Sequence, residues 1–342
     1  RNRTMKKLKG LVCLALSAVM VFTLAACGST FDGNYKEVTG EEYNTTVADA
    51  QAAFENGVEG LLSTKTAGNK NIRLADANGS SASGAKAELK ANFEYKADGV
   101  NVKYGTTSSE EICVNDGKVE AAAKAEVKIK SNLNKKSFDS TLKTEAYTKD
   151  GNLYLNVKAE NKGESATAAP LDSKLKVTTA LTGSLGIDID NVVSFDTLTE
   201  FAGEIVMQSA EELNKAGVKV YMDKTDDMLK VKYVLDKDAY AKLGIGDSKA
   251  EFEVKEYYVV VVLDNNKGLY GVKVKCEVKA TRNEKEVTTS KVEGSVEKTD
   301  KGVKFPSFDK YEEATLDNAA KTVKGMTEFF MTVAQNVGEL FD

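Results

Sequence analysis

The chain has 342 residues and a formal net charge of −5, and it contains neither histidine nor tryptophan. Without histidine there is no Ser-His-Asp or Cys-His catalysis and no imidazole metal ligand, so an enzyme is not the expected function class. The negative charge opposes direct binding to nucleic acid, and the length allows a sizeable core.

The N-terminal segment has the order of regions found in a secretory signal. A basic stretch follows Met5, and an apolar run from Leu11 to Leu24 is too short for a comfortable membrane-spanning helix. The run ends in Leu24, Ala25, Ala26 and Cys27. These four residues resemble the bacterial lipobox. That resemblance implies recognition of the first three residues by a signal peptidase and lipidation of Cys27.

The expected organisation follows from this resemblance. Residues 1–26 are expected to be a signal peptide, 27–38 a lipidated tether, and 39–342 a single domain. Removing the five positive charges of residues 1–26 lowers the net charge from −5 to −10. A diacylglycerol group suffices as an anchor, so the protein is expected on the outer face of a bacterial cell membrane.

The body begins with a helix and continues with strands. Apolar residues recur at three- and four-residue steps over 41–62, which predicts an amphipathic helix. Residues 63–84 are rich in Gly, Ser, Ala and Asn and predict a loop. Strict alternation then predicts several strands: 85–96, 119–129, 141–149, 152–159 and 173–181. Asp150-Gly151 is a favoured hairpin turn between two of them.

The second half repeats this order. A helix is predicted over 197–215, with Ser209 on its inner stripe. The next predicted elements are strands 218–222 and 227–235, a helical turn at 238–243, and a meander of strands 249–263, 268–282 and 285–298. A last amphipathic helix is predicted over 309–341, with Asp309 and Glu312 as its capping box, docked on the sheet.

Two cysteines of the mature chain fall within strands. Cys113 and Cys276 are either a disulfide, if their Cα atoms approach within about 7 Å, or two buried free thiols. Around Asp188 and Asp264 the spacing fails the requirements of a calcium loop, and no nucleotide-binding glycine loop is present. No metal, cofactor or catalytic residue is therefore expected.

Regular strand–helix alternation is absent, which argues against a parallel sheet. The expected fold is α+β: a large curved antiparallel sheet, or half-open β-barrel, covered by a few helices. The element order and the hairpin 147–155 resemble the lipoprotein-carrier superfamily that includes LolA, LolB and LppX-type lipoproteins. The resemblance implies an open half-barrel that holds acyl chains between the sheet and the helices.

Three functions remain open. The first is a membrane-tethered binder or carrier of a hydrophobic, lipid-like ligand on an apolar concave face. The residues expected to line it are Phe93, Tyr95, Phe201, Ile205, Tyr258 and Tyr270. The second is a surface interaction or scaffold lipoprotein with a closed core, a charged outer strand face and an envelope protein as partner. The third is an envelope hydrolase, which the missing histidine disfavours.

Overall fold

In the computed structural model of the chain, the described residues form nine stretches. They are 30–62, 83–115, 118–133, 136–163, 168–178, 202–243, 251–282, 285–299 and 301–338. The predicted signal peptide and lipobox, residues 63–82 of the predicted loop 63–84, and residues 179–201 lie outside these stretches.

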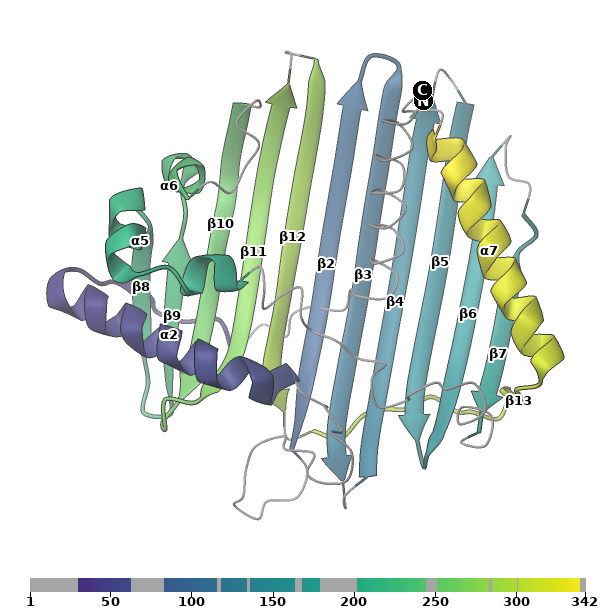
Figure 1. The fold of residues 1–342 in the computed structure, drawn as a ribbon, viewed down its shortest axis with the longest axis horizontal. Coiled ribbons are helices and arrows are strands. Elements are labelled where there is room, and N and C mark those ends of the chain that lie inside the picture. Colours follow the sequence, from purple (N-terminus) through teal and green to yellow (C-terminus); the bar gives the residue numbers. More distant parts are fainter. Residues whose placement is uncertain are drawn as a thin grey trace.

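Within these nine stretches, a single sheet of 13 strands dominates the fold (Figure 1). The first strands in the chain are β1 (Lys36–Glu37), β2 (Ser83–Ala97), β3 (Val100–Asn115), β4 (Lys118–Leu133), β5 (Lys136–Lys149), β6 (Asn152–Gly163) and β7 (Leu171–Val177). The others are β8 (Lys219–Lys224), β9 (Met228–Val234), β10 (Glu251–Asp264), β11 (Leu269–Arg282), β12 (Glu286–Thr299) and β13 (Glu312–Glu313).

The order across the sheet is β1-β8-β9-β10-β11-β12-β2-β3-β4-β5-β6-β7-β13. Neighbouring strands are antiparallel, except that β13 runs parallel to β7. The sheet is not closed, because β1 and β13 are its two edges. The predicted α+β class with a large antiparallel sheet is confirmed.

Turn chemistry explains the hairpins. Asp150 and Gly151 both have positive φ, 50° and 73°, which is the backbone that the predicted two-residue turn requires. In the β10–β11 turn the Asp264 carboxylate accepts hydrogen bonds from the backbone N–H groups of Asn266 and Gly268, each at 2.9 Å. Short local turns therefore set the register of both pairs.

The helices lie on one face of the sheet, called here the helix face; the opposite face is the back face. The helices are α2 (Gly40–Leu62), α5 (Ala210–Ala216), α6 (Lys237–Lys242) and α7 (Leu316–Gly338). Figure 1 shows α2, α5 and α6 over the β8–β11 end of the sheet and α7 over β6 and β7. On α2, Val47, Ala50 and Phe54 of the predicted apolar face lie in the core.

The predicted helix 197–215 is wrong where it crosses Ser209. Residues 202–206 are helical, the helix ends there, and α5 starts anew with Ser209 as its N-cap. The Ser209 hydroxyl accepts from the Glu212 N–H at 3.2 Å, and the Glu212 carboxylate accepts from the Ser209 N–H at 3.0 Å. This capping box satisfies two backbone groups that a continuous helix would have paired internally.

The C-terminal helix docks as predicted but begins later. The cap pair is Thr315 and Asn318, not Asp309 and Glu312: the Asn318 side chain accepts from the Thr315 N–H at 2.7 Å. Residues 301–314 instead run as an extended strap along the back of the sheet to β13 (Figure 1). Among the described residues, no helix combines the length and the apolar character needed to cross a bilayer.

Residues 31–38, predicted as part of a tether, are held against the sheet. Phe31 is 3% exposed and packs with Val260 and Val262 on the back face. The Tyr35 hydroxyl donates to the Phe31 carbonyl at 2.7 Å, and β1 then pairs with β8. Phe31, which lies four residues after Cys27, is therefore already packed on the body.

Candidate functional site

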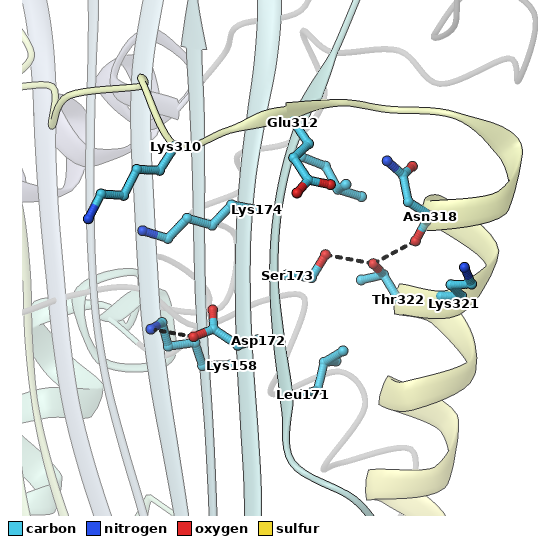
Figure 2. Close-up of a pocket in the computed structure, with 11 residues that line it drawn as sticks. Lys158, Leu171, Asp172, Ser173, Lys174, Lys310, Glu312, Asn318, Lys321 and Thr322 are labelled. Atoms are coloured by element: carbon cyan, nitrogen blue, oxygen red, sulfur yellow. Dashed lines mark hydrogen bonds and ion pairs between the residues drawn. The ribbon is translucent and has the colours of Figure 1, made fainter.

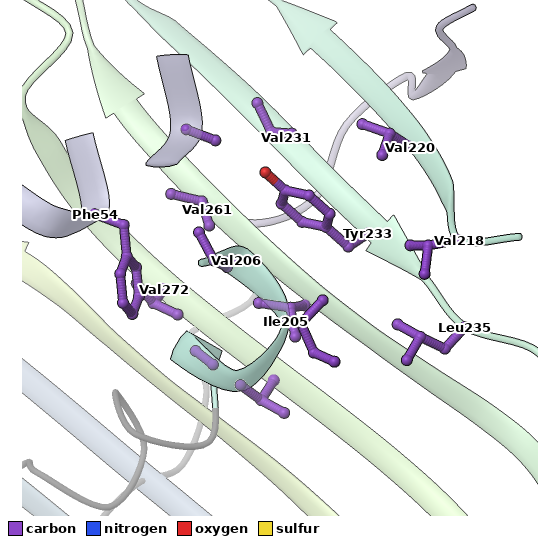
Figure 3. Close-up of a cluster of buried hydrophobic side chains, with 14 of the residues drawn as sticks. Phe54, Ile205, Val206, Val218, Val220, Val231, Tyr233, Leu235, Val261 and Val272 are labelled. Atoms are coloured by element: carbon purple, nitrogen blue, oxygen red, sulfur yellow. The ribbon is translucent and has the colours of Figure 1, made fainter. Parts of the chain in front are cut away.

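The helix face under α2 is a filled core. Val220, Val231, Tyr233, Val261 and Val272 from the strands meet Phe54, Ile205 and Val206 from the helical segments (Figure 3). Ile205, predicted to line a ligand, is 0% exposed within this cluster. This half of the helix face therefore offers no open surface for a ligand.

Phe93 and Tyr95 lie on the helix face of β2, beyond the edge of that core. Phe93 remains 39% exposed, and its ring centroid is 6.1 Å from that of Tyr104 on β3. Their partners on β12 are polar, since Phe93 pairs with Ser290 and Tyr95 with Thr288. Of the predicted lining, these two residues are the ones that share an accessible part of the helix face.

Tyr258 and Tyr270 lie on the back face, so their assignment to one apolar lining with Phe93 was wrong. Tyr257, the neighbour of Tyr258, points into the helix-face core, and alternation sends Tyr258 to the other side. A register shift between Val262 and Leu263 places Tyr270 on the back face as well. Phe201 lies outside the described residues, as do Leu24, Ala25, Ala26 and Cys27.

The two cysteines are free and buried. Cys276 belongs to the helix-face core, whereas Cys113 pairs with Glu120 on β4 and lies on the back face. Strands β12 and β2 lie between β3, which carries Cys113, and β11, which carries Cys276. The two cysteines therefore do not form a disulfide, and both are free thiols. Burial raises the pKa of Cys276 to about 11 and raises that of Cys113.

Strand β3 carries a polar row on the helix face between α2 and α7. Thr106, Ser108 and Glu110 are all buried, and they face Val127, Ala125 and Ala123 of β4. Tyr104 continues the row, and burial raises its pKa to about 12. The side chains opposite these three residues on β4 are apolar.

Helix α7 presents more apolar surface than its docking uses. Phe329 and Val333 pack on Leu142 and Val157, while Met326 and Phe330 are half-buried at the margin of this cluster. The exposed fraction is 73% at Leu316, 64% at Val323 and 57% at Met331. These three residues lie on one side of the helix, so they form an exposed apolar stripe along α7.

A polar groove of about 570 Å³ lies where β7, the strap and α7 meet (Figure 2). Its lining residues are Lys158, Leu171, Asp172, Ser173, Lys174, Leu175, Lys310, Glu312, Asn318, Lys321 and Thr322. The sequence did not reveal it, because residues 309–314 of the strap were predicted as helix.

The chemistry of this groove is that of a structural contact. Thr322 donates to the Asn318 carbonyl at 2.9 Å, so the Ser173 hydroxyl supplies the proton of the 2.7 Å Ser173–Thr322 hydrogen bond. No base is positioned to activate either hydroxyl among the lining residues. Lys158 pairs with Asp172 at 2.9 Å, and β13 pairs with only Leu175 and Lys176 of β7.

Within the described stretches, no group of three or more Cys, Asp or Glu side chains is arranged to hold a metal ion.

No family model matches the chain, and no curated protein matches it. Two solved structures show a distant likeness. A beta-barrel-like protein of a domain of unknown function, DUF1849, from Brucella abortus is 8% identical, with a TM-score of 0.20, over 64% of this chain and 98% of that one. The translocator domain of the autotransporter NalP from Neisseria meningitidis is 9% identical, with a TM-score of 0.18, over 74% and 96%.

Proposed function

We propose that the chain is a membrane-anchored extracytoplasmic lipoprotein that binds a hydrophobic, lipid-like ligand. The binding surface in this proposal is the central part of the helix face, over β2 to β5 between α2 and α7. The anchor is the diacylglycerol that the lipobox resemblance implies on Cys27.

The observation that carries the proposal is the apolar surface left on both sides of this region. Phe93 is 39% exposed on one side, and Leu316, Val323 and Met331 are more than half exposed on the other. An acyl chain lying between them would cover both sets of side chains at about 25 cal/mol per Å² of buried apolar surface.

A second function has support of its own. The core under α2 is filled, with Ile205 fully buried, and the groove beside β7 is polar and charged. Both observations favour an interaction or scaffold lipoprotein that takes no small ligand and meets an envelope protein through charged surface. Whether a ligand binds to the helix face decides between these two functions.

The test is native mass spectrometry of the chain from Gly28 onward, followed by solvent extraction and titration with a hydrophobic dye. The variant Phe93→Glu places a charge on the proposed surface. Asn92→Glu is the matched control, since it adds the same charge one residue away, at an exposed position on the back face.

A co-purified lipid, or dye binding that Phe93→Glu weakens at least tenfold and Asn92→Glu leaves intact, supports the ligand-binding proposal. A clean mass without dye uptake overturns it in favour of the interaction protein. Equal loss in both variants would place the ligand elsewhere than on the helix face.

A further inference from the structure

The proposed anchor point, Cys27, and the buried residue Phe31 are close together in the chain. Phe31 is fixed on the back face, and four residue steps separate it from Cys27. Because an extended chain advances about 3.3–3.6 Å per residue, the Cα atom of Phe31 lies within about 14 Å of that of Cys27. A lipidated Cys27 sits at the level of the lipid headgroups, so the surface around Phe31 must lie beside them.

Several contacts prevent the segment from peeling away to lengthen the tether. The Lys230 ammonium group donates a hydrogen bond to the carbonyl of Asp32. Gly33 lies so close to the Asp223 side chain that a Cβ atom on residue 33 would clash with it. Farther along, Val38 donates its N–H to the Val220 carbonyl at 3.0 Å. The segment is therefore bound at its start, its middle and its end.

The side chains around Phe31 have the chemistry of a membrane interface. Tyr35, Tyr258 and Tyr270 are half-buried and pack on the cluster of Phe31, Val260 and Val262. The ammonium group of Lys232 lies 4.1 Å from the ring centroid of Tyr258 and 5.5 Å from that of Tyr35. Tyrosine and lysine combine an apolar body with a polar tip, which suits the headgroup region.

We infer that the back face over β9, β10 and β11 lies against the phospholipid surface that holds the anchor. The helix face, with its central apolar region, then points away from the bilayer. This inference rests on the lipid anchor of the proposed function, and it adds which face meets the membrane and which receives a ligand.

The chain lacks tryptophan, so the fluorescence of a single introduced tryptophan reports the position of that residue alone. The experiment uses the lipidated protein from bacterial membranes, reconstituted into phosphatidylcholine vesicles with bromine on the upper part of the acyl chains. Tyr258→Trp and Tyr270→Trp place the probe on the back face. Phe93→Trp is the matched control on the helix face.

A further variant tests the cause of the orientation. About twelve glycine and serine residues inserted between Gly28 and Ser29 add about 20 Å of reach and leave the contacts of residues 31–38 in place. The lipidated insertion variants should still float with the vesicles.

The expected result is quenching of both back-face probes, little quenching of Phe93→Trp, and loss of the quenching in the insertion variants. Flotation together with quenching of Phe93→Trp alone, or of neither face, overturns the orientation and leaves the anchor standing. Failure of the native chain to float removes the anchor and overturns the proposed lipoprotein together with this inference.

Discussion

The rings of Tyr154 and Phe308 stack face to face, with centroids 3.8 Å apart and planes 14° from parallel. Tyr154 belongs to β6 and Phe308 to the strap, and Tyr147 and Tyr311 pack edge-on against Phe308. Lys149 lies 4.8 Å above the Phe305 ring beside them. The strap is thus bound to the back face by an aromatic cluster.

Replacing Phe308 with alanine removes the centre of that cluster. We expect Phe308→Ala to lower the free energy of unfolding by about 2 kcal/mol, less than for a fully buried phenylalanine. It should also open residues 301–314 to proteolysis. Urea denaturation and limited digestion measure both effects. The exposed strap residue Lys304 provides the control, and equal losses in Lys304→Ala and Phe308→Ala would contradict the role given to the ring.

The change in unfolding free energy caused by Ser209→Ala has opposite signs for a capped helix start and for a continuous helix. Ser209→Ala removes the capping hydroxyl of α5 and should cost about 1 kcal/mol, whereas Ser209→Thr retains it. Within a continuous helix, alanine would instead stabilise by about 0.5 kcal/mol. Chemical denaturation of the native chain and of the two variants measures this difference. A more stable alanine variant would support the continuous helix that the sequence predicted.

The two thiols should be slow to react while the chain is folded. Burial raises the pKa of Cys276 to about 11, so the thiolate is scarce at about pH 8. Ellman's reagent should leave Cys113 and Cys276 unmodified in the native protein and modify both in concentrated guanidinium. Alkylation of the unfolded chain under non-reducing conditions is the control, since a disulfide would take up no alkyl group and would leave the chain two hydrogens lighter than its reduced mass.

The alternation of side chains made most of the sheet predictable. The residues 85–96 keep a strict period of two, and Asp150-Gly151 is a turn in which both residues tolerate positive φ. Strand β3 has the same period, but its buried positions include Thr106, Ser108 and Glu110. A hydrophobicity pattern therefore does not distinguish its two faces.

The candidate site was less predictable because its side chains depend on distant partners. Alternation alone cannot say that Val262 and Leu263 flank a register shift, which carries Tyr270 to the back face. Residues 309–314 were predicted as helix from the capping-box spacing of Asp309 and Glu312, yet Phe308 and Tyr311 of the strap pack on Tyr154 of a distant strand. Such preferences are set by tertiary contacts and not by local sequence.

Alkaline pH should destabilise the protein, whereas neutral pH should leave its stability nearly constant. No histidine titrates between about pH 6 and 8. Burial raises the pKa of Tyr43 and of Tyr104 to about 12, while a phenol in the unfolded chain titrates near 10. Between these values the unfolded state has released protons that the folded state retains, so the free energy of unfolding falls as pH rises.

Tyr104→Phe keeps the ring and removes one of these titrating groups. Its unfolding free energy should therefore decline less steeply than that of the native chain between about pH 10 and 12. Urea denaturation at a series of pH values measures the slope, and phenolate absorbance reports the titration directly. An identical decline in both proteins would mean that the Tyr104 phenol ionises as readily in the folded chain as in the unfolded one.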